Sequence, residues 1–238
     1  MIEFDRVSKK YGDITALNSF SLKVPTAKIT VLMGLSGSGK TTAIRMVNKM
    51  VTPTSGSVSI DGVDVAARDA VSLRRTVGYV IQEVGLLPHK TVRENVSLIA
   101  RIAGQPADVA EGNATEMLTM VGIDEQFFSR YPQQLSGGQQ QRVGVARALA
   151  IKPNILLMDE PFGAVDPIVR EELQDELCRI QRELGLTIIF VTHDRHEAVK
   201  IADQLVVLSN GGHIEQAGAP SELTATPANA FVRKILGV

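Results

Sequence analysis

The stretch from Gly34 to Thr41, which reads GLSGSGKT, constrains the fold of this chain more than any other. It matches the pattern G-x-x-x-x-G-K-[ST]. Residues 29–33 before it form a short apolar run that predicts a buried strand, and residues 42–50 after it have helical spacing. A strand, a glycine-rich loop and a helix in this order let backbone N–H groups turn inward around phosphate oxygens, where the helix N-terminus adds positive potential. The segment therefore predicts a phosphate-binding loop, and a chance glycine-rich turn is the disfavoured alternative.

Several side chains of this loop have predicted roles. The Lys40 ammonium would reach the outer phosphates, and the Thr41 hydroxyl would hold Mg²⁺. The residues of this segment that we expect to contact a nucleotide are Gly34, Ser36, Gly37, Ser38, Gly39, Lys40, Thr41 and Thr42.

The composition is that of an ordinary globular protein. The 238 residues are 21% charged and 44% hydrophobic, and they suffice for one large α/β domain or two small ones. A net charge of −1 and a pI near 6.4 give no indication of nucleic-acid or anionic-lipid binding. The single cysteine, Cys178, excludes an internal disulfide and fits a reducing compartment.

The sequence shows neither a targeting pattern nor a membrane-spanning one. Residues 1–5 lack the basic and apolar regions of a secretion signal, and no apolar run is long enough to cross a bilayer. We therefore expect a cytoplasmic protein whose link to a membrane comes through a partner.

The hydrophobic patterning predicts an α/β fold. The predicted strands are residues 2–7, 17–24, 28–33, 57–60, 77–81, 154–158, 187–191, 204–209 and 213–216. Between about 85 and 150 the strand signals disappear, and residues 93–103, 107–121 and 140–150 read as helices. We predict one domain over 1–238, with a core formed by 1–84 and 151–238 and an all-helical insertion at 85–150.

Carboxylates and a histidine stand at the ends of predicted strands. Asp159 and Glu160 directly follow an apolar strand, where a carboxylate is costly to bury without a cation or a donor. In a phosphate-loop protein the first commonly supports Mg²⁺, while the second would act as a base toward water or merely be solvated. His193 follows the strand at 187–191 and would donate a hydrogen bond to a phosphate, although most histidines in such a position are structural or surface residues.

Two further features allow a functional and a structural interpretation. Ser136 is well placed to cap a glycine-rich helix start whose N–H groups would receive an anion, and a capped helix start alone is the alternative. Tyr11, just before the second strand, either offers a flat surface for a nucleobase or simply packs.

These motifs, in this order, resemble the ATP-binding subunit of an ABC transporter, and the resemblance covers essentially the whole chain. It implies a P-loop NTPase core of the ABC ATPase type: a mixed sheet with helices on both sides, an antiparallel β subdomain and the inserted helical subdomain. The matching motifs are Walker A at 34–41, the Q-loop glutamine Gln82, the signature at 135–139, Walker B at 155–159, the catalytic Glu160, the D-loop at 163–166, the switch histidine His193 and the adenine-stacking Tyr11.

The resemblance also implies a dimeric site. In the family, two chains facing head to tail bury two ATP molecules, each between the Walker A loop of one chain and the signature of the other. The residues that would face the partner's nucleotide are Ser136, Gly137, Gly138, Gln139 and Asp166. A monomer would hold only half a site, so we expect catalysis to require a second ATP-binding subunit, most simply a second copy.

Further roles follow from the same resemblance. Glu160 would polarise the attacking water, His193 would stabilise the γ-phosphate, and Thr41, Gln82 and Asp159 would hold Mg²⁺. Gln82 would report the γ-phosphate to residues 83–90, and the region from Gln82 to Lys90 would contact the transmembrane permease. A solute-binding protein would act indirectly, and no nucleic acid is expected. The protein would lie at the cytoplasmic face of the membrane, held there by the permease.

Two residues depart from the family pattern. The D-loop begins with Gly163 where many relatives have serine, so any side-chain hydrogen bond at that position is missing. His196 stands where import ATPases often carry an acidic residue. Neither departure removes a catalytic group.

Two segments indicate the class of transporter. Residues 82–89 and 227–237 are most similar to ATP-binding subunits that import glycine betaine, carnitine or choline. Many of those relatives carry tandem CBS domains after this point, whereas this sequence stops at Val238, so we expect that module to be missing or supplied elsewhere. Amino-acid or polyamine import is the nearest alternative. A soluble ABC ATPase of the ribosome or chromosome and a phosphate-loop kinase are more distant ones.

Overall fold

The structure is a computed structural model that describes residues 1–163 and 165–238. The chain divides into two compact units, here called unit 1 (residues 1–74 and 187–238) and unit 2 (residues 75–186). The predicted division into a core and an insertion at 85–150 stays a prediction. In the part of the chain that the structure describes, no helix is both long and apolar enough to span a membrane.

Unit 1 contains an antiparallel sheet with the strand order β2-β1-β4-β5. Its strands are β1 (Ile2–Tyr11), β2 (Ile14–Val24), β4 (Ser55–Ile60) and β5 (Val63–Asp64). Apolar residues alternate along β1 and β2 and bury one face, where the rings of Phe4 and Phe20 meet edge to face with centroids 5.2 Å apart. Both strands of the hairpin formed by β1 and β2 are longer than predicted, and β1 extends to Tyr11 because that residue pairs with Ile14.

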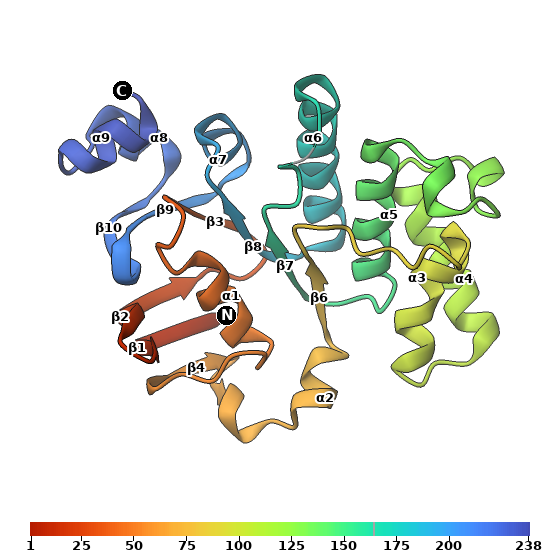
Figure 1. Cartoon of the computed structure of the whole chain (residues 1–238), viewed down its shortest axis with the longest axis horizontal. Helices are drawn as coiled ribbons and strands as arrows, with labels where there is room; N and C mark the ends of the chain where they lie inside the picture. Colours follow the sequence, from red (N-terminus) through yellow and green to blue (C-terminus); the bar gives the residue numbers. More distant parts are fainter. Residues whose placement is uncertain (164) are drawn as a thin grey trace. The chain divides into compact units, whose positions relative to one another are not determined.

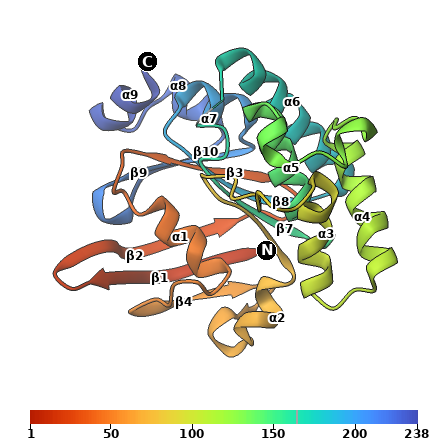
Figure 2. The same ribbon diagram turned by 45° about the vertical axis from the view of Figure 1, so that its right-hand side comes forward.

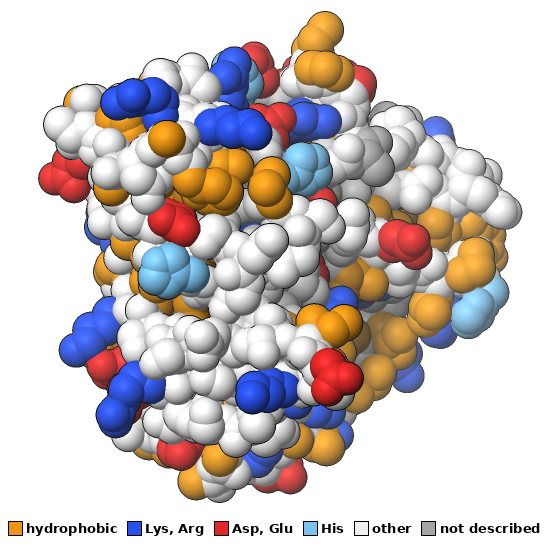
Figure 3. Space-filling view, turned by 60° about the vertical axis from the view of Figure 1, so that its left-hand side comes forward, with side chains coloured by type: hydrophobic (Ala, Val, Ile, Leu, Met, Phe, Trp, Pro, Cys, Tyr) orange, Lys and Arg blue, Asp and Glu red, His pale blue; other side chains and the backbone are white. Residues whose placement is uncertain are grey.

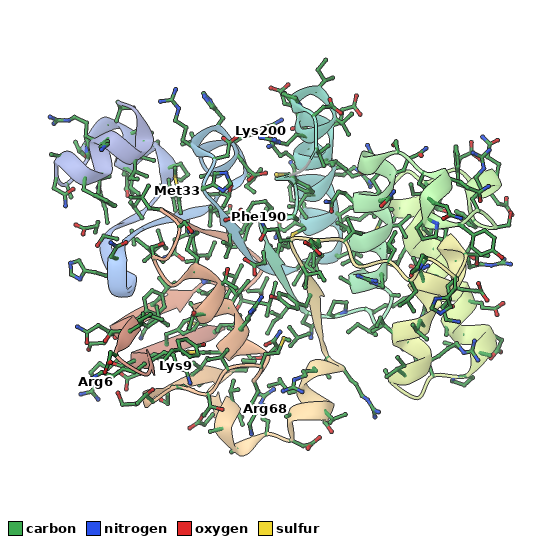
Figure 4. All side chains as sticks on the ribbon, viewed as in Figure 1. Arg6, Lys9, Met33, Arg68, Phe190 and Lys200 are labelled. Carbon is green, nitrogen blue, oxygen red and sulfur yellow. The ribbon has the colours of Figure 1, made fainter. Side chains whose placement is uncertain are left out.

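Four more strands of unit 1 form a mixed sheet in the order β10-β9-β3-β8. They are β3 (Ile29–Gly34), β8 (Thr187–Thr192), β9 (Gln204–Ser209) and β10 (His213–Gly218). Strand β3 is parallel to both β8 and β9, whereas β10 is antiparallel to β9. Every residue of β3 and β8 is buried, as expected for parallel strands covered on both faces, and Figure 4 labels Met33 and Phe190 on these two strands.

Short helices surround the strands of unit 1 (Figure 1). They are α1 (Lys40–Val47), α2 (Ala70–Arg74), α7 (Arg195–Ile201), α8 (Pro220–Ala225) and α9 (Ala230–Leu236), with 3₁₀ turns η1 (Val65–Ala67) and η4 (Asn210–Gly212). The turn η4 joins β9 to β10, which pair antiparallel, so the two strands predicted at 204–209 and 213–216 form a hairpin. Cationic and anionic side chains are interspersed on the face that Figure 3 shows, in line with a net charge of −1.

The described residues of unit 2 form one parallel strand pair and four longer helices. The strands are β6 (Val77–Val80) and β7 (Ile155–Asp159). The helices are α3 (Val92–Ile102), α4 (Ala107–Met120), α5 (Gly137–Leu149) and α6 (Pro167–Leu184), with 3₁₀ turns η2 (Glu125–Phe127) and η3 (Pro132–Gln134). Helices α3, α4 and α5 pack on one another, and α5 and α6 lie side by side (Figures 1 and 2).

Caps explain where the helices of unit 2 begin. Ser136 is the N-cap of α5, as predicted, and its hydroxyl accepts a hydrogen bond from the Gln139 N–H while the Gln139 carboxamide accepts one from the Ser136 N–H. This reciprocal pair starts α5 at Gly137, three residues earlier than the predicted start at 140. Helix α6 begins at Pro167 because Asp166 caps it and Pro167 occupies its first position.

An ion pair joins α5 to α6 within unit 2. The Arg142 guanidinium on α5 binds the Glu176 carboxylate on α6 and also donates to the Val121 carbonyl at 3.0 Å. Both side chains are largely buried, with 19% and 15% of their surface exposed. Burial raises the pKa of Glu176, and Arg142 opposes that rise.

Arg142→Ala should therefore destabilise the protein by about 2–4 kcal/mol, because it leaves a largely buried carboxylate without its main cation. Without Arg142 the pKa of Glu176 in the folded state rises further above its unfolded value. The folded state then binds the proton more tightly, so stability falls as pH rises through that window. Urea unfolding at pH 5 and pH 8 should show the larger loss at pH 8.

Lys152→Ala is the matched control for this prediction. It removes an exposed ion pair with Glu116, 2.8 Å long, in the same unit. Exposed pairs contribute only about 0–1 kcal/mol, so this variant should unfold close to the parent. An equal loss in both variants, or a loss for Arg142→Ala that does not depend on pH, would contradict the account of the buried pair.

Candidate functional site

The loop from Gly34 to Thr41 is shaped by close backbone approaches within unit 1. A Cβ atom on Gly34 would lie 2.3 Å from the carbonyl oxygen of Leu208 on β9. Gly39 has φ +89°, and a Cβ there would lie 2.4 Å from the carbonyl oxygen of Ala16 on β2. Only glycine fits both positions, because strands on either side press against the loop. The loop thus lies between β2 and β9, and α1 begins directly after it.

Lys40 is the first residue of α1, and its side chain turns back along the loop. Its ammonium donates to the carbonyl oxygens of Gly34 at 2.8 Å and Leu35 at 2.9 Å, and only 5% of the residue is exposed. Ser38 is also buried, whereas Ser36 and Gly37 are exposed at the loop tip. A buried cation therefore lies beside a helix N-terminus, an arrangement suited to a phosphate group.

Thr41 and Thr42 lie in the first turn of α1 and are half-buried. With them, the structure places all eight residues predicted to contact a nucleotide in this segment on one continuous loop and helix start.

His193 lies at the same edge of the mixed sheet as this loop. Strands β3 and β8 are parallel, with Met33 opposite Thr192, so the residues that follow them leave the sheet at neighbouring carboxyl ends. His193 is exposed. The residues after His193 are held in place, because the Asp194 carboxylate caps α7 and accepts a hydrogen bond from the His196 N–H at 2.8 Å. The predicted phosphate contacts at the loop and at His193 therefore share one edge of unit 1.

Tyr11 presents an open ring at the end of β1. The residue is 49% exposed, and the Lys9 ammonium lies 5.0 Å from the ring centroid. That ammonium is also anchored by the Thr52 carbonyl oxygen at 2.8 Å (Lys9 is labelled in Figure 4). An exposed, electron-rich ring beside a fixed cation leaves surface on which a base can stack.

The two predicted carboxylates lie at the carboxyl end of β7 in unit 2. Asp159 is buried, and the Tyr79 hydroxyl lies 3.4 Å from its Oδ2. Glu160 is half-buried and has φ +46°, a left-handed conformation that costs a residue other than glycine on the order of 1–2 kcal/mol. Residues in such conformations gather at functional sites.

Gln82 lies close to Glu160. Strands β6 and β7 are parallel with Val80 opposite Met158, which brings the segments after both strands to one edge. Gln82 Nε2 lies 3.5 Å from Glu160 Oε2, the outer limit for a hydrogen bond. The structure thus brings Gln82 close to the neighbouring residues Asp159 and Glu160, which follow it by more than seventy residues in the sequence.

Two helix starts in unit 2 carry the remaining predicted residues. Ser136 caps α5, whose first residues are Gly137 and Gly138. Asp166 caps α6 through the Val169 N–H at 3.1 Å. Within the D-loop, Ala164 lies outside the described residues.

The segment after Gln82 is fixed by residues that sequence reasoning missed. Arg147 on α5 donates to the carbonyl oxygens of Val84 and Gly85, the latter at 2.7 Å. Burial lowers the pKa of Arg147. Asn95 on α3 accepts from the Leu87 N–H at 2.7 Å and donates to the Leu87 carbonyl oxygen at 3.1 Å. No local pattern could reveal these contacts, because they join residues whose pairing depends on how the helices pack.

No group of three or more His, Cys, Asp and Glu side chains that could hold a metal ion occurs within residues 1–163 and 165–238. The expected metal ligands Thr41, Gln82 and Asp159 offer hydroxyl, amide and carboxylate oxygens instead.

A comparison with models of protein families shows to which family the chain belongs. The model of the family described as "ABC transporter" matches residues 17–163. The chain belongs to the ABC transporter family. For this ABC transporter chain, the resemblance inferred from its motifs is confirmed.

Curated relatives of this ABC transporter chain are ATP-binding proteins of the transport class that the sequence predicts. The carnitine transport ATP-binding protein OpuCA of Listeria monocytogenes is 46% identical over 238 residues, covering 100% of this chain and 60% of the relative. The glycine betaine/carnitine/choline transport ATP-binding protein OpuCA of Bacillus subtilis has the same identity over the same length, and 62% of it is covered. The glycine betaine uptake protein YehX of Escherichia coli is 44% identical over 237 residues, with 77% of it covered. The chain thus spans about 60% of the length of the OpuCA relatives.

Solved structures confirm the fold. The dimeric structure of MJ0796, described as a bacterial ABC transporter cassette, matches with a TM-score of 0.83 and 35% identity, covering 92% of this chain and 99% of that one. The cbiO1 structure from Clostridium perfringens, described as part of the cbiONQ transporter complex, has a TM-score of 0.87 and 28% identity, covering 95% and 91% of the two chains. The predicted class, a mixed α/β cassette with an antiparallel β subdomain and a helical region, is therefore correct.

Proposed function

We propose that this chain is the ATP-hydrolysing subunit of an importer for quaternary-ammonium osmoprotectants such as glycine betaine, choline or carnitine. The observation that carries the proposal is 46% identity over all 238 residues to ATP-binding proteins of glycine betaine, carnitine and choline transport. The site supports the catalytic half of the proposal, since the buried Lys40 and the glycine loop suit a polyphosphate.

The nucleotide would be held mainly by unit 1. The loop from Gly34 to Gly39 would surround the phosphates, Lys40 would offset charge on the β- and γ-oxygens, and Thr42 would extend the contacts along the first turn of α1. Tyr11 would stack on the adenine. The exposure of the Tyr11 ring supports this role.

Oxygen donors fit the expected metal. Mg²⁺ prefers oxygen ligands and usually combines one or two protein groups with substrate phosphates and waters. The Thr41 hydroxyl, the Asp159 carboxylate and the Gln82 amide oxygen have the right chemistry, and the ion would offset negative charge on the phosphates when bound.

Hydrolysis would rest on two groups. Glu160 would accept or polarise a proton of the attacking water, and its left-handed backbone conformation supports a functional role. His193 would donate to the γ-phosphate and stabilise the charge that develops on it. Gln82, 3.5 Å from Glu160, would sense the γ-phosphate beside the base.

The second half of each site would come from a partner chain. The helix start capped by Ser136, with the N–H groups of Gly137 and Gly138 and the side chain of Gln139, offers donors for the partner's γ-phosphate. Asp166 would join them there. Binding of two nucleotides between two chains would close the dimer, and hydrolysis would open it, a cycle able to drive alternating access. The dimeric MJ0796 cassette supports this arrangement.

The permease would bind the region from Gln82 to Lys90. Support comes from its backbone, which Arg147 and Asn95 hold in place while Pro88 and His89 at its far end are exposed. A solute-binding protein would deliver the substrate to the permease rather than to this chain. The chain would therefore work at the cytoplasmic face of the membrane.

Reconstituted uptake tests the proposed substrate class. The chain, with the permease and solute-binding protein of its transport system, should accumulate labelled glycine betaine, choline or carnitine in vesicles supplied with internal ATP. Uptake should cease with Lys40→Ala. Transport of amino acids or polyamines, with no transport of the three quaternary amines, would overturn the substrate class and leave the ATPase role standing.

A further inference from the structure

The second signature glycine, Gly138, faces a side chain of its own chain. A Cβ atom on Gly138 would lie 2.5 Å from Val169 Cγ1 on α6. Carbon atoms in contact normally keep about 3.5–4.0 Å, so a methyl group on Gly138 would have to push the two helices apart by about 1 Å. A methyl group at this position would therefore meet Val169, independently of any contact that the Gly138 N–H makes with a ligand.

Val169 cannot easily move out of the way. Its side chain is β-branched, and such residues have one strongly preferred rotamer in a helix. Its backbone N–H donates to the Asp166 carboxylate at 3.1 Å, which fixes it in the first turn of α6. The contact thus joins a rigid first turn of α6 to the first turn of α5.

A second layer of contact lies one turn further along the same two helices. Arg142, four residues after Gly138, binds Glu176 and lies 3.8 Å from Glu172. Helix α5 therefore contacts α6 at two places. The contact between Gly138 and Val169 joins the two helix starts, which Ser136 and Asp166 cap.

We infer that Val169 is a positioning residue: by packing against Gly138 it holds the signature helix start in register with the D-loop helix start. This inference rests on the proposed function, in which both helix starts face the partner's nucleotide. The Val169 side chain does not need to touch that nucleotide. The signature N–H groups would move with α5 as a rigid body, so a shift of about 1 Å at Gly138 displaces donors that must meet a phosphate, and such misplacement can cost about a hundredfold in rate.

The test is a size-swap cycle measured as steady-state ATPase kinetics. Gly138→Ala keeps the backbone N–H but adds the methyl group, and should lower kcat by about tenfold to a hundredfold. Val169→Ala in the same chain makes room for that methyl, which then refills the contact, so the double variant should recover to within about threefold of the parent. Binding of a fluorescent ATP analogue to the Val169→Ala variant should stay within about twofold of the parent, because Val169 lies in unit 2 and the Walker A loop belongs to unit 1.

A matched control uses the neighbouring residue Ile168. It lies on the same turn of α6 but is 76% exposed, so Ile168→Ala opens no space next to Gly138 and should not rescue Gly138→Ala. Circular dichroism and thermal melting of every variant would show whether each is folded. A further variant, Val169→Leu, enlarges the side chain on α6 instead of the one on α5. In an otherwise unchanged chain it should lower kcat as Gly138→Ala does.

The outcomes separate the inference from the proposed function. If Gly138→Ala is folded and inactive and Val169→Ala does not restore it, the methyl group interferes with the nucleotide directly, and the inference is wrong while the ATPase role stands. If Gly138→Ala has the activity of the parent, the inference is also wrong. A parent chain without ATPase activity would contradict the proposed function and the inference with it.

Discussion

Glu160→Gln should bind ATP yet hydrolyse it about a hundredfold more slowly or worse, since a general base commonly contributes at least that factor. The amide has nearly the shape of the carboxylate but cannot take a proton from water. We expect the substitution to leave the backbone of residue 160 unchanged, because its left-handed conformation is part of the turn that follows β7. Single-turnover hydrolysis and nucleotide binding measured on the same preparation would separate the two effects.

The matched control for this variant is Glu111→Gln. Glu111 is an exposed glutamate on α4 in the same unit, and its amide variant should hydrolyse ATP like the parent. Near-normal turnover in Glu160→Gln would refute the assignment of the base. Loss of ATP binding in that variant would show that the carboxylate serves binding rather than chemistry.

Lys40→Ala should abolish detectable ATP hydrolysis and weaken ATP binding about a hundredfold or more, because charge-assisted contacts to phosphate are among the strongest available to a protein. The Lys40 ammonium also ties the loop together through the carbonyls of Gly34 and Leu35, so the variant loses the cation and loosens the loop. Isothermal titration with ATP would measure the first effect, and thermal melting would measure the second.

Lys23→Ala serves as the control for loss of a lysine in unit 1. Lys23 forms an exposed ion pair with Glu3 at 3.2 Å, and such pairs have little effect. ATP affinity should not change in that variant. If Lys40→Ala binds ATP as tightly as the parent, the phosphate-loop assignment fails at its central residue.

Much of the site follows from local sequence because its parts are local. A phosphate loop needs glycines and a lysine at fixed spacing between a strand and a helix, and all of these lie within Gly34–Thr41. The caps at Ser136 and Asp166 are equally local, since each side chain bonds an N–H three residues on. Such features survive in a single sequence without any knowledge of packing.

The contacts that hold these parts in place are not local. The pairing of Arg142 with Glu176, of Arg147 with the Val84 carbonyl, and of Gly138 with Val169 depends on how helices pack over long sequence separations. The signature motif marks Gly138 as a glycine, but nothing in the motif says that Val169 occupies the space beside it. The sequence did not predict the start of α5 at Gly137 or the full length of β1. Glycines disfavour a helix, so they gave no helix signal at the start of α5, and the polar end of β1 gave no strand signal.

The dependence of ATPase activity on protein concentration tests most directly whether two chains complete each site. The specific activity of the purified chain should fall toward zero on dilution, and sedimentation of Glu160→Gln should show monomers without nucleotide and dimers with ATP. Specific activity that stays constant down to concentrations at which only monomers sediment would show that one copy is sufficient, and would contradict the account.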